Sequence, residues 1–410
     1  MRASKPTIKS VLAPKKGQTV KETKPTANGN VSLSKITQLE SFLNNHYDFK
    51  MNVVTSRVEF KRKIETDFRL LTEVELNSIY RFVCTNNINT TTGNVKTLLY
   101  SDFIKKYDPF HDYLFNLSPW DGLDDYISKL ADKVTSSYQD YWRYCFKKWF
   151  VAMVASVLEE NVVNHTVIVM SGAQGIGKSS FVYSLLPREL KKFIYSGNIN
   201  PSAKDTAVML AEVMIINLDE LEGLNKSEIS SLKEMITKLK IKIRKAYGCH
   251  AEDLIRRASF IGSVNGTNFL RDSTGSRRFL CHEVESIDFN HSIDLDKVYA
   301  QALHLFRSDF KFHFDGEEIE EITRHNQKFQ ETSMEEDFIL QYFEQIEVNV
   351  AQVFMNATDI MVYLSSFVKI TSSNATKQNI GKALTKHGFH RVKRNGLQMY
   401  AVKLKNQITN

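Results

Sequence analysis

Residues 172–180 combine glycines with a lysine and two serines at a spacing that suits phosphate binding. They follow the apolar, β-branched run 166–171 and precede residues that can begin a helix, which is the context that a phosphate-binding loop requires. The glycines let backbone N–H groups turn toward a phosphate. Lys178 would contact the β- and γ-phosphates of ATP, and Ser179 would give Mg²⁺ a hydroxyl ligand. The predicted loop residues are Gly172, Ala173, Gln174, Gly175, Ile176, Gly177, Lys178, Ser179 and Ser180.

A pair of carboxylates, Asp219 and Glu220, ends the apolar run 213–218. Such a run is typical of a central parallel strand that is buried on both faces. Ligands of α/β sheets bind at the carboxyl ends of strands, so these acids would lie beside the nucleotide. Asp219 would hold Mg²⁺ directly or through water, and Glu220 would polarise the attacking water. The alternative is two solvated acids at a strand end.

A second apolar run, 258–264, ends in the amide Asn265. In P-loop ATPases with an extra strand between the two nucleotide-binding strands, a polar residue at this position touches the γ-phosphate and the water. We expect Asn265 to have this sensor role, although an Asn after a strand can also be only a turn residue.

Two adjacent arginines, Arg277 and Arg278, follow twelve residues later. A guanidinium near a γ-phosphate stabilises the charge of the transition state, and a neighbouring subunit can supply it. Neighbouring residues of a strand point to opposite faces, so we expect only one of the two to reach a nucleotide. The sequence does not choose between them.

Cations alternate with Ile241 and Ile243 in the segment 240–245. The alternation places the cations on one face of a strand or hairpin, which in a ring could face the pore and bind DNA phosphates without reading sequence. The alternative is an exposed face that forms salt bridges. The candidate DNA-binding residues here are Lys240, Lys242, Arg244 and Lys245.

Taken in this order, these motifs resemble the virulence-associated protein E family of phage and plasmid ATPases, which look related to the superfamily III helicases of the AAA+ class. The similarity extends from about Tyr107 to about Phe329. Several other residues stand where the family pattern places such residues: Lys233, Thr237, Arg257 and Asp272. One departure is Ser263-Val264 before Asn265, where related sequences tend to carry Thr.

The resemblance implies ATP hydrolysis coupled to DNA unwinding by a hexameric ring during replication of a mobile element. We expect any primase activity to come from another chain, because no primase domain fits in residues 34–135. A different class of function stays open: a P-loop DNA-binding switch, such as a loader, a packaging ATPase or an anti-phage defence ATPase, that hydrolyses ATP without unwinding.

The composition agrees with a folded protein of several domains. The chain has 410 residues, of which 42% are hydrophobic and 25% are charged, as in ordinary soluble proteins. No apolar run is long enough to span a membrane, so we expect a cytoplasmic location in a bacterial host. Four scattered cysteines indicate neither a zinc site nor a disulfide framework.

Basic charge is concentrated at the two ends. Residues 1–35 carry a net charge of +7, residues 356–410 carry +8, and the part between them is net negative. This asymmetry favours a polyanion partner that the ends contact, and DNA is the expected one. Residues 1–33 have few large apolar side chains and are predicted to be a disordered basic arm.

Periodicity predicts an α/β chain whose parallel P-loop sheet is of the AAA+ or ASCE type and is flanked by helices. Residues 34–135 are predicted as a mainly helical accessory domain with a strand or hairpin over 49–60. Its aromatic side chains are expected in its core, with base-stacking platforms as the alternative. Residues 285–345 are predicted as a helical lid or linker. The predicted divisions are 1–33, 34–135, 136–284, 285–345 and 346–410.

The last 65 residues resemble a winged helix. Helical patterns over 357–367 and 375–387 precede a hairpin, 389–405, whose tip is the turn pair Asn395-Gly396. We expect this basic domain to contact DNA, mainly through phosphates, although a winged helix can also bind only protein. The candidate DNA-binding residues are Lys377, Lys382, Lys386, Arg391, Lys393 and Arg394.

Overall fold

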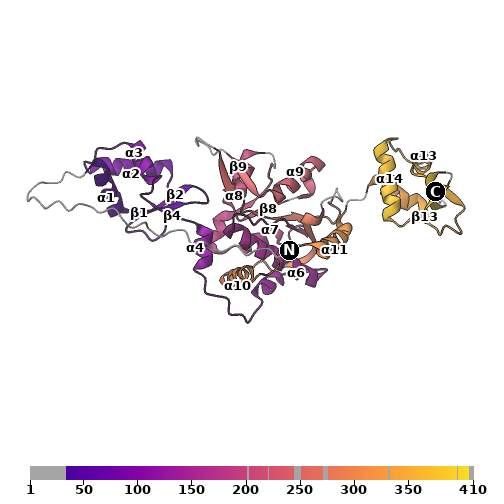
Figure 1. The fold of residues 1–410 in the computed structure, drawn as a ribbon, viewed down its shortest axis with the longest axis horizontal. Coiled ribbons are helices and arrows are strands. Elements are labelled where there is room, and N and C mark those ends of the chain that lie inside the picture. Colours follow the sequence, from indigo (N-terminus) through magenta and orange to yellow (C-terminus); the bar gives the residue numbers. More distant parts are fainter. Residues whose placement is uncertain are drawn as a thin grey trace, which may run out of the picture. The chain divides into compact units, whose positions relative to one another are not determined.

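The structure is a computed structural model that describes residues 34–200, 203–219, 221–243, 251–270, 276–330, 333–394 and 396–405. These residues form two compact units (Figure 1). The described part of the first unit covers 34–51 and Arg57–Lys106. The second covers Asn52–Ser56 and continues from Tyr107.

The first unit contains a sheet with the strand order β3-β2-β1-β4 and three helices. Its core is built from apolar residues of both, including Leu43, Val58 and Val83. A capping box at Thr72 and Glu75 begins the second helix. The elements are α1 (Lys35–His46), β1 (Tyr47–Asn52), β2 (Arg57–Arg62), β3 (Arg69–Leu70), α2 (Glu73–Thr85), α3 (Thr92–Leu99) and β4 (Lys105–Tyr107).

The predicted accessory domain, 34–135, therefore differs from the structure in two respects. Its first part contains a sheet, and its last part belongs to the second unit. The physical reason is burial: α4 (Pro109–Phe115) and α5 (Tyr126–Ala131) place Phe110, Ile127 and Leu130 in the core of the second unit.

The described strands of the second unit's main sheet follow the order β5-β12-β6-β11-β8-β7. All neighbours are parallel except the edge strand β5. The strand β11 therefore lies between β6, which precedes the glycine loop, and β8, which precedes Asp219. The strands are β5 (Val134–Ser136), β6 (Val167–Ser171), β7 (Ile194–Ser196), β8 (Ile215–Leu218), β11 (Ser259–Val264) and β12 (Phe279–Ile287).

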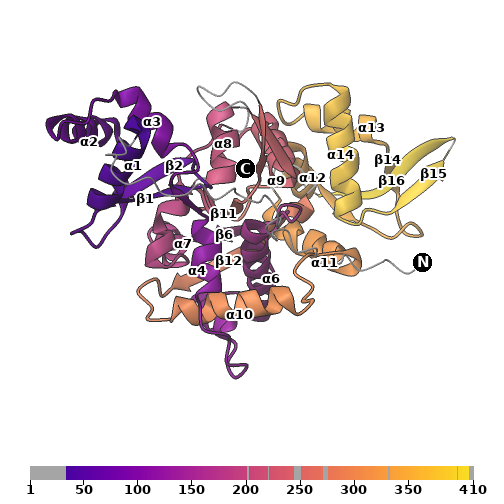
Figure 2. The same cartoon turned by 60° about the vertical axis from the view of Figure 1, so that its left-hand side comes forward.

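Helices cover both faces of this sheet because successive strand residues point to opposite sides. On β6, Ile168 and Met170 enter one core, and Val167 and Val169 enter the other. Figures 1 and 2 show α6 and α10 together on the first face. The helices are α6 (Gln139–Leu158), α7 (Lys178–Ser184), η1 (Arg188–Phe193), α8 (Lys204–Glu212), η2 (Leu221–Gly223), α9 (Lys226–Thr237), η3 (Ser276–Arg278), α10 (Leu295–Arg307), α11 (Gly316–Asn326) and η4 (Gln327–Phe329).

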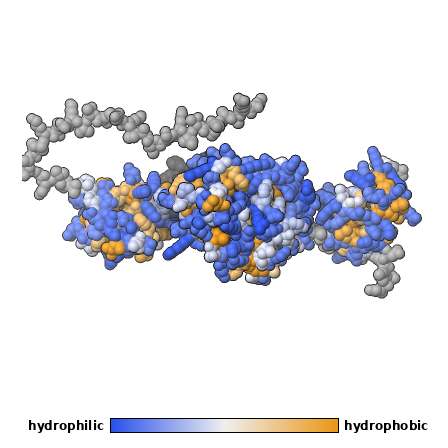
Figure 3. Space-filling model, turned by 90° about the horizontal axis from the view of Figure 1, so that it is seen from below, coloured by the Kyte–Doolittle hydropathy of each residue, from blue (hydrophilic) through white to orange (hydrophobic). Residues whose placement is uncertain are grey.

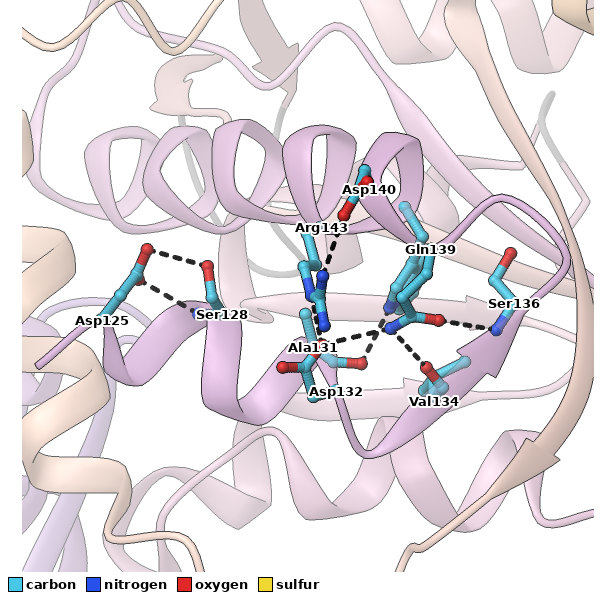
Figure 4. A network of polar contacts seen from close by, with 10 residues as sticks. Asp125, Ser128, Ala131, Asp132, Val134, Ser136, Gln139, Asp140 and Arg143 are labelled. Carbon is cyan, nitrogen blue, oxygen red and sulfur yellow. Dashed lines mark hydrogen bonds and ion pairs between the residues drawn. The ribbon is translucent and has the colours of Figure 1, made fainter.

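The helix α6 is buried over most of its surface and organises the first face. The Trp149 indole donates a hydrogen bond of 3.0 Å to the carbonyl of Phe260 on β11, which links the helix to the sheet. At its N-terminal end, Arg143 pairs with Asp132 and Asp140, and Gln139 bonds β5 (Figure 4). These contacts fix the helix that underlies the central strands.

The C-terminal part forms its own core and a sheet with the order β13-β16-β14, in which β15 also pairs with β16. The predicted helices and hairpin over 357–405 all form, although Asn395 of the predicted tip lies outside the described residues. The elements are α12 (Met334–Tyr342), β13 (Phe343–Gln345), β14 (Val353–Met355), α13 (Ala357–Ser365), α14 (Asn374–Lys386), β15 (Arg391–Arg394) and β16 (Leu397–Leu404).

The molecular surface is mostly hydrophilic on the face that Figure 3 shows, with apolar side chains scattered between polar ones. Among the described helices, none combines the length and the apolar composition that crossing a bilayer demands.

Candidate functional site

The glycine loop lies at the carboxyl end of β6, and α7 begins at its lysine. Gly177 has a φ of 97°, and a Cβ at this position would overlap the ring of Phe289. A Cβ at Gly172 would overlap the carbonyl oxygen of Val284 on β12. Only glycine fits these two positions, because one needs a left-handed backbone and the other needs close approach to a neighbouring strand. The residues Ala173, Gln174, Gly175 and Ser180 are exposed, while Ile176 and Ser179 are half-buried.

The Lys178 side chain is buried and lies over this loop. Its Nζ donates hydrogen bonds to the carbonyl oxygens of Gly172 at 2.6 Å and Ala173 at 2.8 Å, and contacts Asn265 Oδ1 at 3.4 Å. Burial lowers the pKa of Lys178, and the nearby carboxylate of Glu222 opposes that change. The ammonium is thus held within reach of the loop backbone, where a phosphate would bind.

Asp219 lies at the end of β8 and receives hydroxyl and amide hydrogen bonds. Ser179 Oγ donates to its Oδ1 at 3.0 Å, and Ser196 Oγ donates to its Oδ2 at 2.8 Å. Asn217 Nδ2 also donates to Oδ1, at 2.9 Å. The two predicted Mg²⁺ ligands, Ser179 on α7 and Asp219 after β8, are therefore in direct contact.

This pair fits the chemistry of Mg²⁺, a hard cation that takes oxygen ligands and usually one or two protein groups beside phosphates and waters. Among the described residues no cluster of three or more His, Cys, Asp or Glu side chains could form a closed protein cage for a metal. A site with few protein ligands and open positions suits a cation that is shared with a nucleotide.

Asn265 follows β11 and contacts an acid that the sequence reasoning missed. The Oε1 atom of Glu222 receives hydrogen bonds from the backbone N of Asn265 at 3.2 Å and from its Nδ2 at 3.3 Å. Glu222 lies on the short helix η2 after β8. The only sequence signal was a second glutamate two residues after Glu220, and Glu220 itself lies outside the described residues.

Four predicted residues thus come together at the carboxyl ends of β6, β8 and β11: Lys178, Ser179, Asp219 and Asn265. They do so because the three strands are parallel and adjacent. Each side chain is contributed by a loop or helix that starts where its strand ends, as expected for a ligand site in an α/β sheet.

Arg277 and Arg278 lie at the opposite end of the parallel strands, where the strands begin. They belong to η3, which precedes β12, and Phe279 at the start of β12 pairs in register with Val167 at the start of β6. The glycine loop lies at the other end of β6, and β6 is about 13 Å long at ~3.3 Å per residue. Neither arginine is therefore placed to touch a nucleotide on the loop of its own chain.

The arginines border a cavity of about 250 Å³ together with His165, Thr166 and His313. Arg277 is exposed, while Arg278 is half-buried and its Nε has no hydrogen-bond partner in the described structure. Burial and the neighbouring Arg277 lower the pKa of Arg278. The pKa of His165 is lowered mainly by burial and also by the charges of Arg256 and Arg278. This edge of the sheet is electropositive and accessible through Arg277.

The predicted cation stripe lies on β9 (Lys240–Ile243), which pairs antiparallel with β10 (Glu252–Ile255). Lys240 and Lys242 are exposed, and Ile241 between them is buried in the core. Asp253 lies opposite Lys242 in the register. Arg244 and Lys245 lie outside the described residues.

The predicted DNA-binding cations of the C-terminal part divide into two groups. Lys386 pairs with Glu336 at 2.7 Å, and the Arg394 guanidinium lies 3.3 Å from the ring centroid of Phe354. These two have structural partners in the chain. The others lie on α14 and β15, where Lys377 is half-exposed and the remaining three are exposed: Lys382, Arg391 and Lys393.

Comparison with solved structures finds matches of low sequence identity. Three structures of the NrS-1 C-terminal region, two of them described as residues 305–718, align with TM-scores of 0.45 and 13% sequence identity. The alignments cover 90–91% of this chain and 99–100% of those chains. No curated protein matches the chain.

Comparison with protein families gives a match over more than half of the chain. The virulence-associated protein E-like domain matches residues 114–331. The matched range starts in α4 and ends after η4, so it contains the whole of the main sheet and every residue of the site that the structure brings together. The chain therefore belongs to the virulence-associated protein E-like family.

Proposed function

We propose that the chain is an ATP-dependent DNA helicase or translocase of a phage or other mobile element, which hydrolyses ATP at the interfaces between subunits of a ring. The observation that carries this proposal is the convergence of Lys178, Ser179, Asp219 and Asn265 at one edge of a parallel sheet. The family match over residues 114–331 supports the proposal, because the resemblance to this family implies replication of a mobile element.

The strand order supports an ASCE-type P-loop core of the AAA+ class. In the structure β11 lies between the strand that leads into the glycine loop and the strand that ends at Asp219. Asn265 at the end of that middle strand is then next to the loop lysine, at 3.4 Å. This is the position that a residue sensing the γ-phosphate needs.

The roles of the residues follow from these contacts. Lys178 would exchange its two carbonyl acceptors for β- and γ-phosphate oxygens, and the loop N–H groups would bind the β-phosphate. Ser179 and Asp219 would hold Mg²⁺, which when bound neutralises charge on the β- and γ-phosphates. Asn265 would orient the attacking water, and Glu220 would polarise it.

The arginines at the other edge support a shared site. The glycine loop lies where the parallel strands end, and Arg277, which is exposed, lies where they begin. The two can meet only when a second copy of the chain is stacked against the first. Arg277 is the better candidate for contact with a neighbour's γ-phosphate because it is exposed, whereas Arg278 is half-buried.

The shared site is tested by mixing inactive variants. We expect Lys178→Ala and Arg277→Ala to abolish most ATP hydrolysis singly, by at least about 10³-fold for the loss of a finger arginine. Mixing the two variants should restore part of the activity, since some interfaces then combine an intact loop with an intact Arg277. Arg324→Ala, on the surface of α11, is the control. No activity in any mixture would contradict the shared site.

Unwinding is tested by strand displacement on forked DNA under conditions in which rings form. The wild type should displace a strand in an ATP-dependent manner, and Lys178→Ala should not. Hydrolysis without displacement would instead favour a DNA-binding ATPase switch. A double variant, Lys240→Ala/Lys242→Ala, should hydrolyse ATP and lose displacement if β9 contacts the DNA.

A further inference from the structure

The first unit contains a cavity of about 510 Å³ between α1, the strands β1 and β2, and α2. This volume lies in the range of pockets that bind small molecules or single units of a polymer. None of its lining residues belongs to the ATP site described above. The residues on which the following argument rests are His46, Phe60, Arg62, Arg69, Arg81 and Phe82.

Aromatic side chains form one wall of this cavity. Phe82 is 39% exposed, although large apolar side chains are usually covered. His46 lies edge-on against Phe82, with ring centroids 5.2 Å apart, and Phe42 supports Phe82 at 5.3 Å. His46 Nδ1 is 2.8 Å from the carbonyl oxygen of Phe42, which fixes the orientation of its ring. An exposed ring held by its neighbours is suited to stack on a planar group.

The Phe60 ring already carries one planar cation. The Arg69 guanidinium lies 4.4 Å from its centroid, and Glu65 and Glu75 pair with this arginine at 2.5 Å and 2.8 Å. Glu75, an acid of the cavity wall, is therefore neutralised from within the unit. The Arg69 guanidinium therefore stays stacked on Phe60, and Glu75 adds no uncompensated negative charge to the cavity.

Two other guanidiniums at the cavity have no such partner. Arg62 and Arg81 are exposed, and neither forms an ion pair with another residue that the structure describes. Arg62 lies at the end of β2, and Arg81 precedes Phe82 on α2. Exposed guanidiniums beside an exposed aromatic ring provide phosphate binding and base stacking at one place.

We propose that this cavity binds a nucleotide unit of single-stranded DNA, with the base against Phe82 and the phosphate between Arg62 and Arg81. The inference does not depend on the proposed ATPase activity. It takes up, for Phe82, the base-stacking alternative to the expectation that the aromatic residues of this segment form the core. A free nucleotide shares the same chemistry, and the experiment separates the two sources.

The test measures binding of a fluorescent oligothymidylate to the full chain by anisotropy over a series of salt concentrations. Phe82→Ala should weaken binding on the order of tenfold with an unchanged salt dependence, because stacking involves no counterion. Arg81→Ala should reduce the slope of log affinity against log salt by about 0.7, the value for one phosphate of a single strand. Phe82→Tyr should retain binding.

Matched controls come from the same unit. Tyr100→Ala and Arg57→Ala remove an exposed ring and an exposed cation that do not line the cavity, and both should leave binding unchanged. Lys178→Ala should also bind the oligonucleotide normally, so that loss of ATP hydrolysis and loss of this site remain distinguishable. Unchanged binding in Phe82→Ala and Arg81→Ala would overturn the proposal.

Photo-crosslinking gives a direct readout. An oligonucleotide with bromodeoxyuridine should crosslink to a peptide that contains Phe82, as mapped by mass spectrometry. Crosslinks confined to other segments would overturn the assignment. Thymidine monophosphate that binds as tightly as the oligothymidylate would also overturn it, because the site would then take a free nucleotide.

Discussion

Glu222 connects two strand ends at the scale of single residues. One carboxylate oxygen receives both hydrogen bonds from Asn265, and its charge favours the protonated form of Lys178. The other oxygen, Oε2, is buried without a hydrogen-bond partner in the described structure. A buried oxygen without a hydrogen-bond partner costs free energy, which offsets part of what the two hydrogen bonds to Oε1 contribute to stability. We infer that Glu222 positions Asn265.

This role predicts different effects for two substitutions of Glu222. Glu222→Ala removes the acceptor of Asn265 and should lower the kcat of ATP hydrolysis by about tenfold, with a smaller change in KM, because the water-orienting amide is then misplaced. Glu222→Gln keeps an acceptor oxygen and should retain most of the activity. Steady-state hydrolysis kinetics measure both effects.

The control for this comparison is Glu234→Gln, an exposed acid of α9. An equal loss of activity in Glu222→Gln and Glu222→Ala would contradict the positioning role, since it would show that the negative charge itself is required.

The site residues that were predictable from sequence belong to a local motif or directly follow an apolar run. Lys178 ends the glycine loop, Asp219 and Asn265 each come directly after an apolar run, and parallel pairing of the strands then brings the three together. Glu222 was not predictable, because its partner lies 43 residues away and no local pattern indicates the contact. The location of Arg277 could have been deduced: it precedes its strand, so it must lie at the opposite edge from residues that follow theirs.

At the scale of elements, Glu336 ties α12 to the end of α14. Its buried carboxylate accepts hydrogen bonds from Lys386 Nζ and His387 Nε2, both at 2.7 Å. Burial would raise the pKa of Glu336, but the two hydrogen bonds and charges outweigh it, and the pKa is lowered. A carboxyl group whose pKa is lower in the folded state stabilises that state above its unfolded pKa.

The stability of the C-terminal part should therefore depend on pH through Glu336. Glu336→Gln should lower the unfolding midpoint at neutral pH by a few degrees, on the order expected for the loss of a paired buried charge. The difference from wild type should shrink as the pH falls below the ordinary glutamate value of 4.5. Thermal unfolding followed by circular dichroism over a pH series measures this.

Glu344→Gln is a matched control, because Glu344 also pairs with a lysine, Lys403, but is exposed on β13. It should change the midpoint little at any pH. A difference between Glu336→Gln and wild type that persists undiminished at low pH would contradict the ionic origin of the effect.

Elements were predictable where periodicity is local. The helical patterns over 357–367 and 375–387 correspond to α13 and α14, and the apolar runs correspond to β6, β8 and β11. In the first unit, β1 and β2 lie where alternation over 49–60 predicts a strand or hairpin, but the pairing of β1 with β4, more than fifty residues later in the chain, was not predictable. Hydrophobic spacing does not reveal a pairing of such separation, and β3 is only two residues long.

At the scale of the whole molecule, the unpaired cations on α14 and β15 predict a salt-dependent affinity for DNA. The triple variant Lys382→Ala/Arg391→Ala/Lys393→Ala should weaken binding and reduce the salt slope by about 0.9 for each duplex phosphate contact that is lost. Hydrolysis of ATP without DNA should not change. Anisotropy with labelled duplex DNA measures the slope.

Lys403→Ala removes a cation that is already paired with Glu344, and it should leave the slope unchanged. A triple variant with the wild-type slope would show that this surface does not bind DNA. It would then favour a protein partner for the C-terminal part.

Charge distribution was the whole-molecule property that the sequence displayed best, since basic residues are concentrated at both ends. The charge distribution did not reveal which cations are available to bind DNA. Lys386 and Arg394 contribute to the same net charge as Lys382, yet they have partners in the chain, Glu336 and Phe354. Availability depends on contacts that form only in the folded protein.

The placement of the glycine loop and Arg277 on opposite edges of one sheet has a consequence for symmetry. In a twofold dimer residue i of one subunit contacts residue j of the other and j contacts i, so a twofold dimer completes either two sites or none. In the proposed ring, subunits contact head to tail, which leaves one incomplete site in any open oligomer and none in a closed one. The specific rate of hydrolysis should therefore increase with protein concentration until closure is reached.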